Sequence, residues 1–600
     1  GYRNIYCSVW SMYYDRGKKI MKKIIKCLIE AIFSFLGILI YTKLIYNFGS
    51  YNLLISLLFI IIFVFYYKFN FKFDKKEKKY SLILSIILSL MLSIGSIVSL
   101  YIDEIKLIFD IKNILYVLIC FIGFVILIYK VFGILLKKIN NVSVTEEHKK
   151  MKIKTFLLII AIIFIGDLFY FVRFYPAIMT PDSYYVIHYA NNFILSDFHT
   201  FGHTWIFGIF FHLGKFIFNN LNEAVAFSII IQMFCMSTIF ASGIRYFYNK
   251  GLNKNICILL TIFFAISPLH THYSITLWRD ILFGGSFVII LICLYEFISS
   301  KDKIKTSYIL LFIIGILILL FFRNNGIYVY LFTIPFIIIF MKNKRIMMSI
   351  LTISIACFYF IIKGPVFDYF NIQKTSSVEA FSIPLQQIAR VIASDKEIDI
   401  KDEEYLRELF EDYDKVSSDY KTYISDPIKR LTKNDVLSNR KDDFFKTYLH
   451  LFTKYPNIYI ESYFSQTLGY WYPDIIYNST GGESTSIFES EDVYCSPLTP
   501  KWYNKLIDMS VSRKIPLSNF IWSLGVQFII LLISFTITLY FGNKKYLLCY
   551  VPLFGLWISM MVATPVFCEL RYVYGLFTCA PFLMFLPFII NNNRINKKTK

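Results

Sequence analysis

The chain has 600 residues, of which 56% are hydrophobic and 19% aromatic, and its mean hydropathy is +0.56. A water-soluble protein of this length would divide into several domains with a more polar surface, so the composition excludes that class. The net charge of +21 does not indicate a nucleic-acid partner, because the lysines stand in short clusters at the ends of apolar runs. We therefore expect an integral membrane protein that is embedded in the lipid bilayer.

Apolar runs long enough to cross the hydrocarbon core recur along most of the chain. They predict an all-α polytopic membrane protein with about fourteen transmembrane helices. We expect these spans near residues 24–46, 51–69, 80–101, 113–136, 155–175, 222–245, 256–273, 281–299, 308–322, 327–341, 346–362, 517–541, 546–562 and 572–590.

The spans group into a modular order along the chain. Residues 1–20 precede Met21-Lys22-Lys23, which is typical of a natural start, so we expect 1–20 to be an upstream or non-native segment. Residues 21–150 carry four spans with few polar residues and are predicted to form an N-terminal membrane module. A membrane core follows over 151–362, and residues 517–600 contribute the last spans and a basic cytoplasmic tail.

The distribution of lysine and arginine predicts which connections face the cytoplasm. Residues 203–219 are apolar enough for a short span, but a crossing there would place the lysine-rich connections outside. An interfacial helix keeps those connections and both termini in the cytoplasm, which is the arrangement that we expect in the cell (plasma) membrane. The loop 176–221 and the segment 363–516, which is long enough for a mainly α domain, then face outward.

The outward loop opens with the sequence Thr180-Pro181-Asp182-Ser183. Pro181 biases Thr180 toward an extended conformation, so Thr180 is expected to cap a helix that begins there. Asp182 is then presented at the membrane surface, where a carboxylate can accept a proton from a nucleophilic hydroxyl. The alternative is that Asp182 only caps a helix in a solvated loop.

Further along the same loop, Asp197, His199 and His203 could form a metal site or a phosphate-facing hydrogen-bond cluster. The spacing of the two histidines places them on one helical face, but it fixes no third ligand and Gly202 weakens a helix there. The eleven cysteines include no CxxC pair, so they indicate neither a disulfide framework nor a zinc site. The sequence therefore requires no cofactor, and it leaves a divalent metal open.

Several other outward segments pair a charge with the membrane boundary. Arginine suits phosphate recognition because its planar fork makes bidentate hydrogen bonds, although a single boundary charge is usually an anchor or a local ion pair. Several such segments on one side of the membrane predict a shared polar cavity. The candidate substrate-binding residues, besides Asp197, His199 and His203, are Arg279, Asp280, Arg323, Asn324, Gln386, Gln387, Arg390, Glu569 and Arg571.

Three motifs together resemble the GT-C superfamily of integral membrane glycosyltransferases, in particular an uncharacterised bacterial branch. They are Met179-Thr180-Pro181-Asp182-Ser183, the stretch Ser382–Arg390 and Glu569-Leu570-Arg571-Tyr572, and the resemblance covers roughly 155–590. It implies a GT-C-like fold, Asp182 as the catalytic base and arginines that hold a lipid phosphate. The branch often has Asp-x-His-Pro in the loop, whereas Thr200 follows Asp197-Phe198-His199 here. Asp182 also has no acidic neighbour of the kind that binds a metal.

The predicted function is therefore transfer of a sugar from a polyprenyl-phosphate-linked donor to a glycan, lipid or protein acceptor on the extracytoplasmic face. Two alternatives stay open. A multi-pass transporter or lipid-linked oligosaccharide flippase would place ionisable residues near the bilayer midplane, where the sequence has mainly Asp167 and Glu30. A cell-wall polysaccharide polymerase or ligase would share the topology and the lipid-phosphate chemistry.

Overall fold

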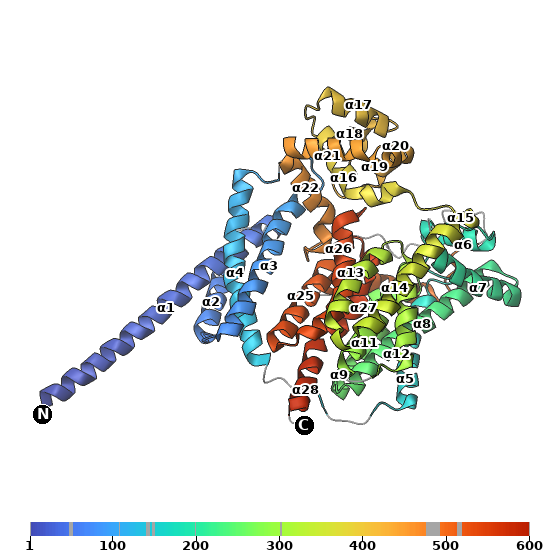
Figure 1. The fold of residues 1–600 in the computed structure, drawn as a ribbon. Helices are drawn as coiled ribbons and strands as arrows, with labels where there is room; N and C mark the ends of the chain where they lie inside the picture. The colour runs from blue at the N-terminus through green and yellow to red at the C-terminus, as the bar shows by residue number, and fades with distance from the viewer. Residues whose placement is uncertain are drawn as a thin grey trace. The chain divides into compact units, whose positions relative to one another are not determined.

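The computed structural model describes residues 2–46, 52–106, 108–139, 144–146, 150–197, 200–300, 303–475, 493–512 and 519–598. Within these ranges the chain is helical, and the extended pairings are isolated bridges, not strands (Figure 1). The chain forms two compact units, one of residues 1–142 with 460–465 and the other of residues 143–459 with 466–600. The prediction of an all-α membrane protein is confirmed at this level.

The first unit is built on four long helices, which Figure 1 draws in blue. A capping box starts α3, because Asp74 accepts from the backbone N–H of Glu77 and Glu77 accepts from that of Asp74. Gly37 and Gly123 let two helices touch, since a Cβ at Gly123 would lie 2.5 Å from the Phe33 carbonyl oxygen. The helices are α1 (Tyr2–Tyr46), α2 (Asn52–Lys68), α3 (Lys75–Leu100) and α4 (Ile111–Ile139).

The second unit holds the remaining apolar helices, which pack around the deeply buried α11. Its membrane elements are α5 (Ile153–Phe171), α8 (Leu221–Asn249), α9 (Lys254–Ile266), α10 (Pro268–Ser274), α11 (Asp280–Ser299), α12 (Thr306–Phe322), α13 (Gly326–Phe340), η1 (Lys342–Lys344), α14 (Arg345–Ile361), η2 (Ile362–Val366), α15 (Phe367–Tyr369), α24 (Asn519–Trp522), α25 (Leu524–Phe541), η6 (Lys544–Tyr550), α26 (Val551–Ala563), η7 (Leu570–Val573), α27 (Tyr574–Leu583) and α28 (Leu586–Lys598).

The number of spans differs from the predicted fourteen. Among the described residues, nine helices are long and apolar enough to cross a membrane, or up to eleven if each of two bent pairs is one span. The bends arise where Pro268 and Pro587 interrupt the α9–α10 and α27–α28 runs, because proline lacks the N–H that a continuous helix needs. Three more predicted spans are helices too short for that criterion: Ile55–Lys68, Thr306–Phe322 and Gly326–Phe340.

The outward loop forms two helices, α6 (Pro181–Asn191) and α7 (Phe201–Phe218). The α7 helix is not among the candidate spans, and Trp205 and Phe216 on it are exposed. Its predicted place in the membrane interface, like the sidedness of the chain, stays a prediction.

Within the predicted segment 363–516, the described residues are mainly helical, and residues 378–459 have an apolar core that includes Leu385, Leu406, Leu409, Phe444 and Leu451. Its elements are η3 (Ser377–Phe381), α16 (Ser382–Ala393), α17 (Ile400–Leu409), α18 (Lys415–Asp419), α19 (Asp426–Leu431), α20 (Asn434–Asn439), α21 (Lys441–Lys454), α22 (Pro456–Thr467), η4 (Leu468–Tyr470) and α23 (Lys501–Val511). Residues 377–459, which belong to the second unit, are called the helical domain below.

Candidate functional site

The loop that carries Asp182 is fixed to the connection between α10 and α11. Ile178 exchanges backbone hydrogen bonds with this connection, accepting from Leu277 N–H and donating to the Ile275 carbonyl, both at 3.1 Å. The Ser183 hydroxyl donates to the Leu277 carbonyl at 2.9 Å. The Trp278 indole donates to the Thr180 hydroxyl at 2.7 Å. Two segments almost a hundred residues apart therefore hold the start of α6 in one place, with Thr180 as its N-cap.

Asp182 stands in the first turn of α6 and forms an ion pair with Arg571. The Asp182 side chain is 36% exposed, whereas that of Arg571 is 17% exposed, so the carboxylate is the more accessible partner. The Arg571 guanidinium also lies 3.7 Å from the Glu569 carboxylate and 4.7 Å from the centre of the Trp278 ring. The same tryptophan thus contacts both the Asp182 loop and the arginine that pairs with Asp182.

A second arginine–carboxylate pair, between Arg323 and Asp280, is nearly buried. Arg323 also donates from Nε to Asn325 Oδ1 at 3.0 Å, which orients its fork. The ring of Tyr572 lies 4.3 Å from the Arg323 guanidinium and 5.1 Å from that of Arg571. Because both arginines contact this one ring, the two ion pairs form a single cluster.

Arg279 belongs to the same cluster. Burial lowers the pKa of Arg279; Arg323 and Arg571 act in the same direction, while Asp280 and Asp182 oppose it. Its charged neighbours therefore include all four members of the two ion pairs, and Lys363 also interacts with it. The structure brings together six predicted residues, which we call the charge cluster: Asp182, Arg279, Asp280, Arg323, Glu569 and Arg571.

A polar network continues from Arg323 through Asn324. The Asn324 side-chain amide donates to the Asp197 carbonyl at 3.3 Å and to the Thr375 hydroxyl at 2.8 Å. Lys363 pairs with the Asp197 carboxylate and donates to Asn324 Oδ1 at 3.1 Å. The sequence reasoning named Asp197 and Asn324 but missed Lys363, whose only signal was a basic residue at the outer end of a predicted span.

His203 is buried and packs among aromatic rings, with ring centres 5.7 Å from Phe322 and 6.4 Å from Phe207. The adjacent Gly202 permits this packing, since a Cβ there would lie 2.6 Å from the Cβ of Phe321. Its predicted partner, His199, lies outside the described residues. The predicted histidine pair is therefore not tested, and metal or phosphate contact by these histidines stays a prediction.

Gln386, Gln387 and Arg390 lie inside the helical domain. Gln387 donates to the Tyr459 carbonyl at 3.0 Å and accepts from the Tyr448 hydroxyl at 2.7 Å, and Arg390 is buried. Gln386 donates to the carbonyls of Lys421 and Ile424. These side chains therefore hold the domain together, and substrate contact by them stays a prediction.

The segment that Gln386 holds is joined to the loop before Glu569. The Phe567 N–H donates to the Tyr423 carbonyl at 2.9 Å, and the Ser425 N–H donates to the Pro565 carbonyl at 2.8 Å. The helical domain thus fixes the chain two residues before Glu569.

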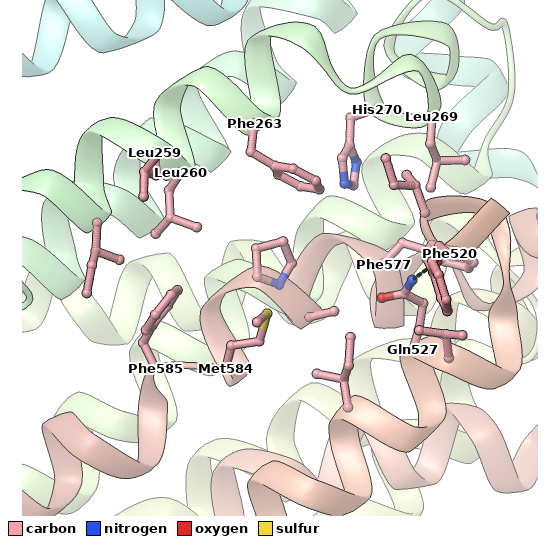
Figure 2. A pocket seen from close by; sticks show the side chains of 16 residues that line it. Leu259, Leu260, Phe263, Leu269, His270, Phe520, Gln527, Phe577, Met584 and Phe585 are labelled. Atoms are coloured by element: carbon pink, nitrogen blue, oxygen red, sulfur yellow. Dashed lines mark hydrogen bonds between the residues drawn. The ribbon is translucent and has the colours of Figure 1, made fainter. Parts of the chain in front are cut away.

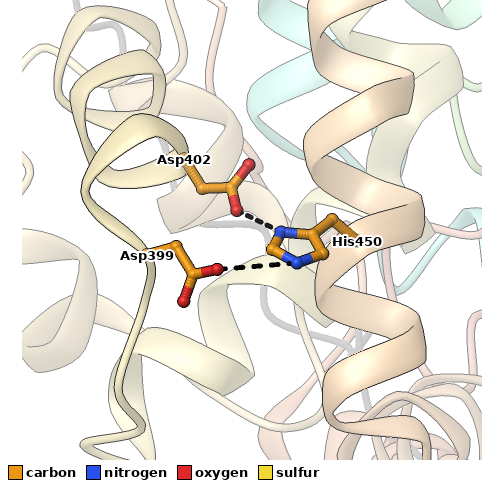
Figure 3. Close-up of side chains that lie close together, drawn as sticks. All are labelled: Asp399, Asp402 and His450. Carbon is orange, nitrogen blue, oxygen red and sulfur yellow. Dashed lines mark hydrogen bonds and ion pairs between the residues drawn. The ribbon is translucent and has the colours of Figure 1, made fainter.

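One group of metal-ligating side chains occurs among the described residues: Asp399, Asp402 and His450 (Figure 3). His450 Nδ1 lies 2.5 Å from the Asp402 carboxylate and Nε2 lies 3.6 Å from that of Asp399. Lys454 pairs with Asp399 at 2.6 Å, and the Thr447 hydroxyl donates to Asp402 at 2.9 Å. These contacts already give both carboxylates hydrogen-bond and ion-pair partners. We therefore interpret the group as an ion-pair network between α17 and α21. None of its members was predicted.

A cavity of about 330 Å³ lies among the α9–α10 pair, α25 and α27 (Figure 2). Its lining is almost entirely apolar, with Phe263, Leu269, Phe577 and Met584 among its side chains. Two polar groups reach it: His270, which contacts the Tyr574 hydroxyl at 3.0 Å, and Gln527. Sequence reasoning missed this cavity because its lining residues are indistinguishable from ordinary apolar span residues.

A search of curated proteins finds no match, and neither does a search of solved structures. Residues 17–600 match a family of unknown function, DUF6020. Because this match covers nearly the whole chain, the protein belongs to the DUF6020 family.

Proposed function

We propose that the protein is a membrane glycosyltransferase that moves a sugar from a polyprenyl-phosphate donor to a hydroxyl acceptor, with Asp182 as the base. The observation that carries the proposal is the charge cluster. Three arginines from different parts of the chain lie in one cluster with the accessible Asp182 carboxylate, which pairs with Arg571, while Arg323 pairs with Asp280. Arginine forks bind phosphate oxygens bidentately, and a carboxylate beside them can receive the acceptor proton.

In this proposal, the ion pair between Asp182 and Arg571 is the arrangement of the site before the donor binds. The phosphate of a donor competes with Asp182 for the Arg571 guanidinium, because both are anions that need the same fork. Donor binding therefore releases the Asp182 carboxylate from its cation. Since a neighbouring cation weakens a carboxylate as a base, the donor itself makes Asp182 a better base.

The transfer then needs no second carboxylate. Asp182 takes the proton of the acceptor hydroxyl, whose oxygen forms a bond to the anomeric carbon. The bond between that carbon and the phosphate oxygen breaks, and the lipid phosphate leaves as an anion that the arginines stabilise. A glycosidase needs an acid to protonate its leaving group, but a phosphate leaves without one.

The apolar cavity suits part of an isoprenoid chain. Its lining includes residues of α10 and α27, and the chain next to these two helices contains Trp278 and Arg571 of the charge cluster. A lipid phosphate at the arginines would thus have its chain beside these helices. Sites of this size and lining commonly hold apolar ligands.

The test is turnover of purified full-length protein in lipid nanodiscs with synthetic polyprenyl-phosphate hexoses and pentoses, followed as release of polyprenyl phosphate. Asp182→Asn is expected to lower turnover by at least about 100-fold. The matched control is Asp508→Asn, because Asp508 forms an exposed pair with Arg173 at 2.9 Å outside the cluster. Turnover of Asp182→Asn near the wild-type rate would reject the base assignment.

One observation favours a transporter or lipid-linked oligosaccharide flippase as the second candidate. The α9 and α10 helices meet at a bend of 57°, and Asp167 of the adjacent α5 is buried. Broken helices beside a buried ionisable residue are common in transporters. Movement of a fluorescent polyprenyl-phosphate sugar across the bilayer without release of polyprenyl phosphate would favour this candidate. A polysaccharide polymerase or ligase would instead release lipid phosphate only with a glycan acceptor.

A further inference from the structure

A carboxylate without a cationic partner lies inside the helix bundle. Asp167 of α5 is 1% exposed. The groups that act on its carboxylate, within the described part of the chain, include the hydroxyls of Ser237 on α8 and Ser274 on α10, and the Tyr574 phenol of α27 also interacts with it. Burying an ionised carboxylate is strongly unfavourable unless a positive charge or a proton neutralises it. The site therefore needs either a bound proton or a bound cation at this carboxylate.

The Ser237 hydroxyl stands too far from the carboxylate for a good hydrogen bond. Ser237 Oγ lies 3.5 Å from Asp167 Oδ2, whereas O–H···O bonds are about 2.7 Å long. The Ser274 hydroxyl is buried and makes no hydrogen bond of normal geometry among the described residues. Two oxygens that bind one ion at about 2.4 Å and at right angles lie about 3.4 Å apart, which is close to the observed spacing.

Next to Asp167, the backbones of α5 and α9 are in close contact, and the chain after α9 bends. A Cβ at Gly166 would lie 2.0 Å from the Ala265 carbonyl oxygen, so the end of α9 lies directly against α5 beside Asp167. The chain bends two residues later, at Ser267–Pro268. Discontinuous helices at this kind of bend carry cation sites in membrane proteins, because the carbonyls there lack helical donors.

We propose that Asp167, Ser237 and Ser274 form a binding site for a dehydrated monovalent metal cation, with Na⁺ as the ion to test. Oxygen-only ligands suit a hard cation. The single carboxylate balances one positive charge, whereas a divalent ion would leave a net charge buried.

The site connects to the charge cluster through the chain after Ser274. Gln232 donates to the carbonyls of Ser274 and Thr276, at 2.9 and 2.8 Å. The next residues, Leu277 and Trp278, hold the loop that carries Asp182. A cation bound to Ser274 would therefore hold in place the residues that position the Asp182 loop. Binding of the cation does not itself require a sugar donor.

The experiment uses the purified full-length chain in detergent without any sugar donor. Binding of ²²Na⁺ and the thermal unfolding midpoint are measured against NaCl, with N-methylglucamine chloride holding the ionic strength constant. Wild-type protein is expected to bind ²²Na⁺ saturably, and its midpoint is expected to rise with the same Na⁺ dependence. Asp167→Asn is expected to abolish both effects, and Ser237→Ala to weaken ²²Na⁺ affinity by about tenfold.

Glu30→Gln is the matched control, because Glu30 is also a carboxylate in an apolar helix but lies 3.8 Å from Lys26. It is expected to keep the Na⁺ response. The assignment is overturned if wild-type protein shows no saturable Na⁺ effect or if Asp167→Asn retains it. Stabilisation by acid with no response to Na⁺ would also overturn it, since a proton would then neutralise Asp167. Neither readout depends on the proposed glycosyl transfer.

Discussion

Arg571 forms an ion pair with Asp182, although the two residues are 389 positions apart in the chain. The pair exists because the Asp182 loop and the turn at η7 both lie against Trp278. Arg571 contacts the Trp278 and Tyr572 rings and two carboxylates at once.

The planar shape of the Arg571 guanidinium should contribute more to donor binding than its positive charge alone. Arg571→Lys keeps a cation beside Asp182 but loses the planar, bidentate group that holds both a phosphate and an aromatic face. We expect KM for a polyprenyl-phosphate sugar to rise about tenfold or more, with the protein still folded. Turnover kinetics in nanodiscs measure this. Arg173→Lys, at the exposed pair with Asp508, is the control and should leave KM unchanged.

The hydrogen bond between Trp278 and Thr180 positions Asp182. Thr180→Val has nearly the same shape but removes the acceptor, which leaves a part-buried indole N–H unsatisfied. We expect kcat to fall about tenfold with a smaller change in KM, because the missing bond costs about 1–2 kcal/mol in loop placement. Thr180→Ser keeps the hydroxyl and should restore kcat. Equal rates for the valine and serine variants would contradict the positioning role.

Gly166 permits the contact between α5 and α9. Gly166→Ala would place a Cβ 2.0 Å from the Ala265 carbonyl, so the two backbones must separate. We expect the free energy of unfolding to fall by about 3 kcal/mol, as for severe overpacking. Denaturant titration in mixed micelles measures it. Gly364→Ala is the matched control, since a Cβ there meets nothing within 4 Å and should be neutral.

Acid should loosen the contact between α17 and α21. The Lys454 ammonium holds the pKa of Asp399 below its usual value, and Arg440 does the same for Asp443. A lowered folded-state pKa gives stability that is present above the unfolded value and lost as pH falls through the folded one. Hydrogen exchange in α17 and α21 should therefore rise only below about pH 4. In the Asp399→Asn variant, hydrogen exchange in α17 and α21 should increase less on acidification. An increase in exchange already between about pH 5 and 8 would contradict the assignment of the effect to these carboxylates.

The sequence determined the class of the protein and the identity of the charge-cluster residues. Apolar runs identify membrane helices because a span must bury about 20 residues in hydrocarbon. The lysine clusters assign sides to the connections, which is how Asp182, Arg279, Arg323 and Arg571 were predicted to face one shared site. Both signals are local in the chain, so they need no knowledge of packing.

Only the tertiary structure decided which charged residues of the cluster pair with one another. Pairing of Asp182 with Arg571, and of Asp280 with Arg323, depends on how helices far apart in sequence pack, and no spacing rule encodes that. The same limit explains the glutamines of α16, whose motif looked like a substrate contact but whose side chains bind backbone carbonyls. The bend at Ser267–Pro268 and the hydroxyls around Asp167 also became visible only when α5, α8 and α10 were seen together, because burial and distance are properties of the packed chain.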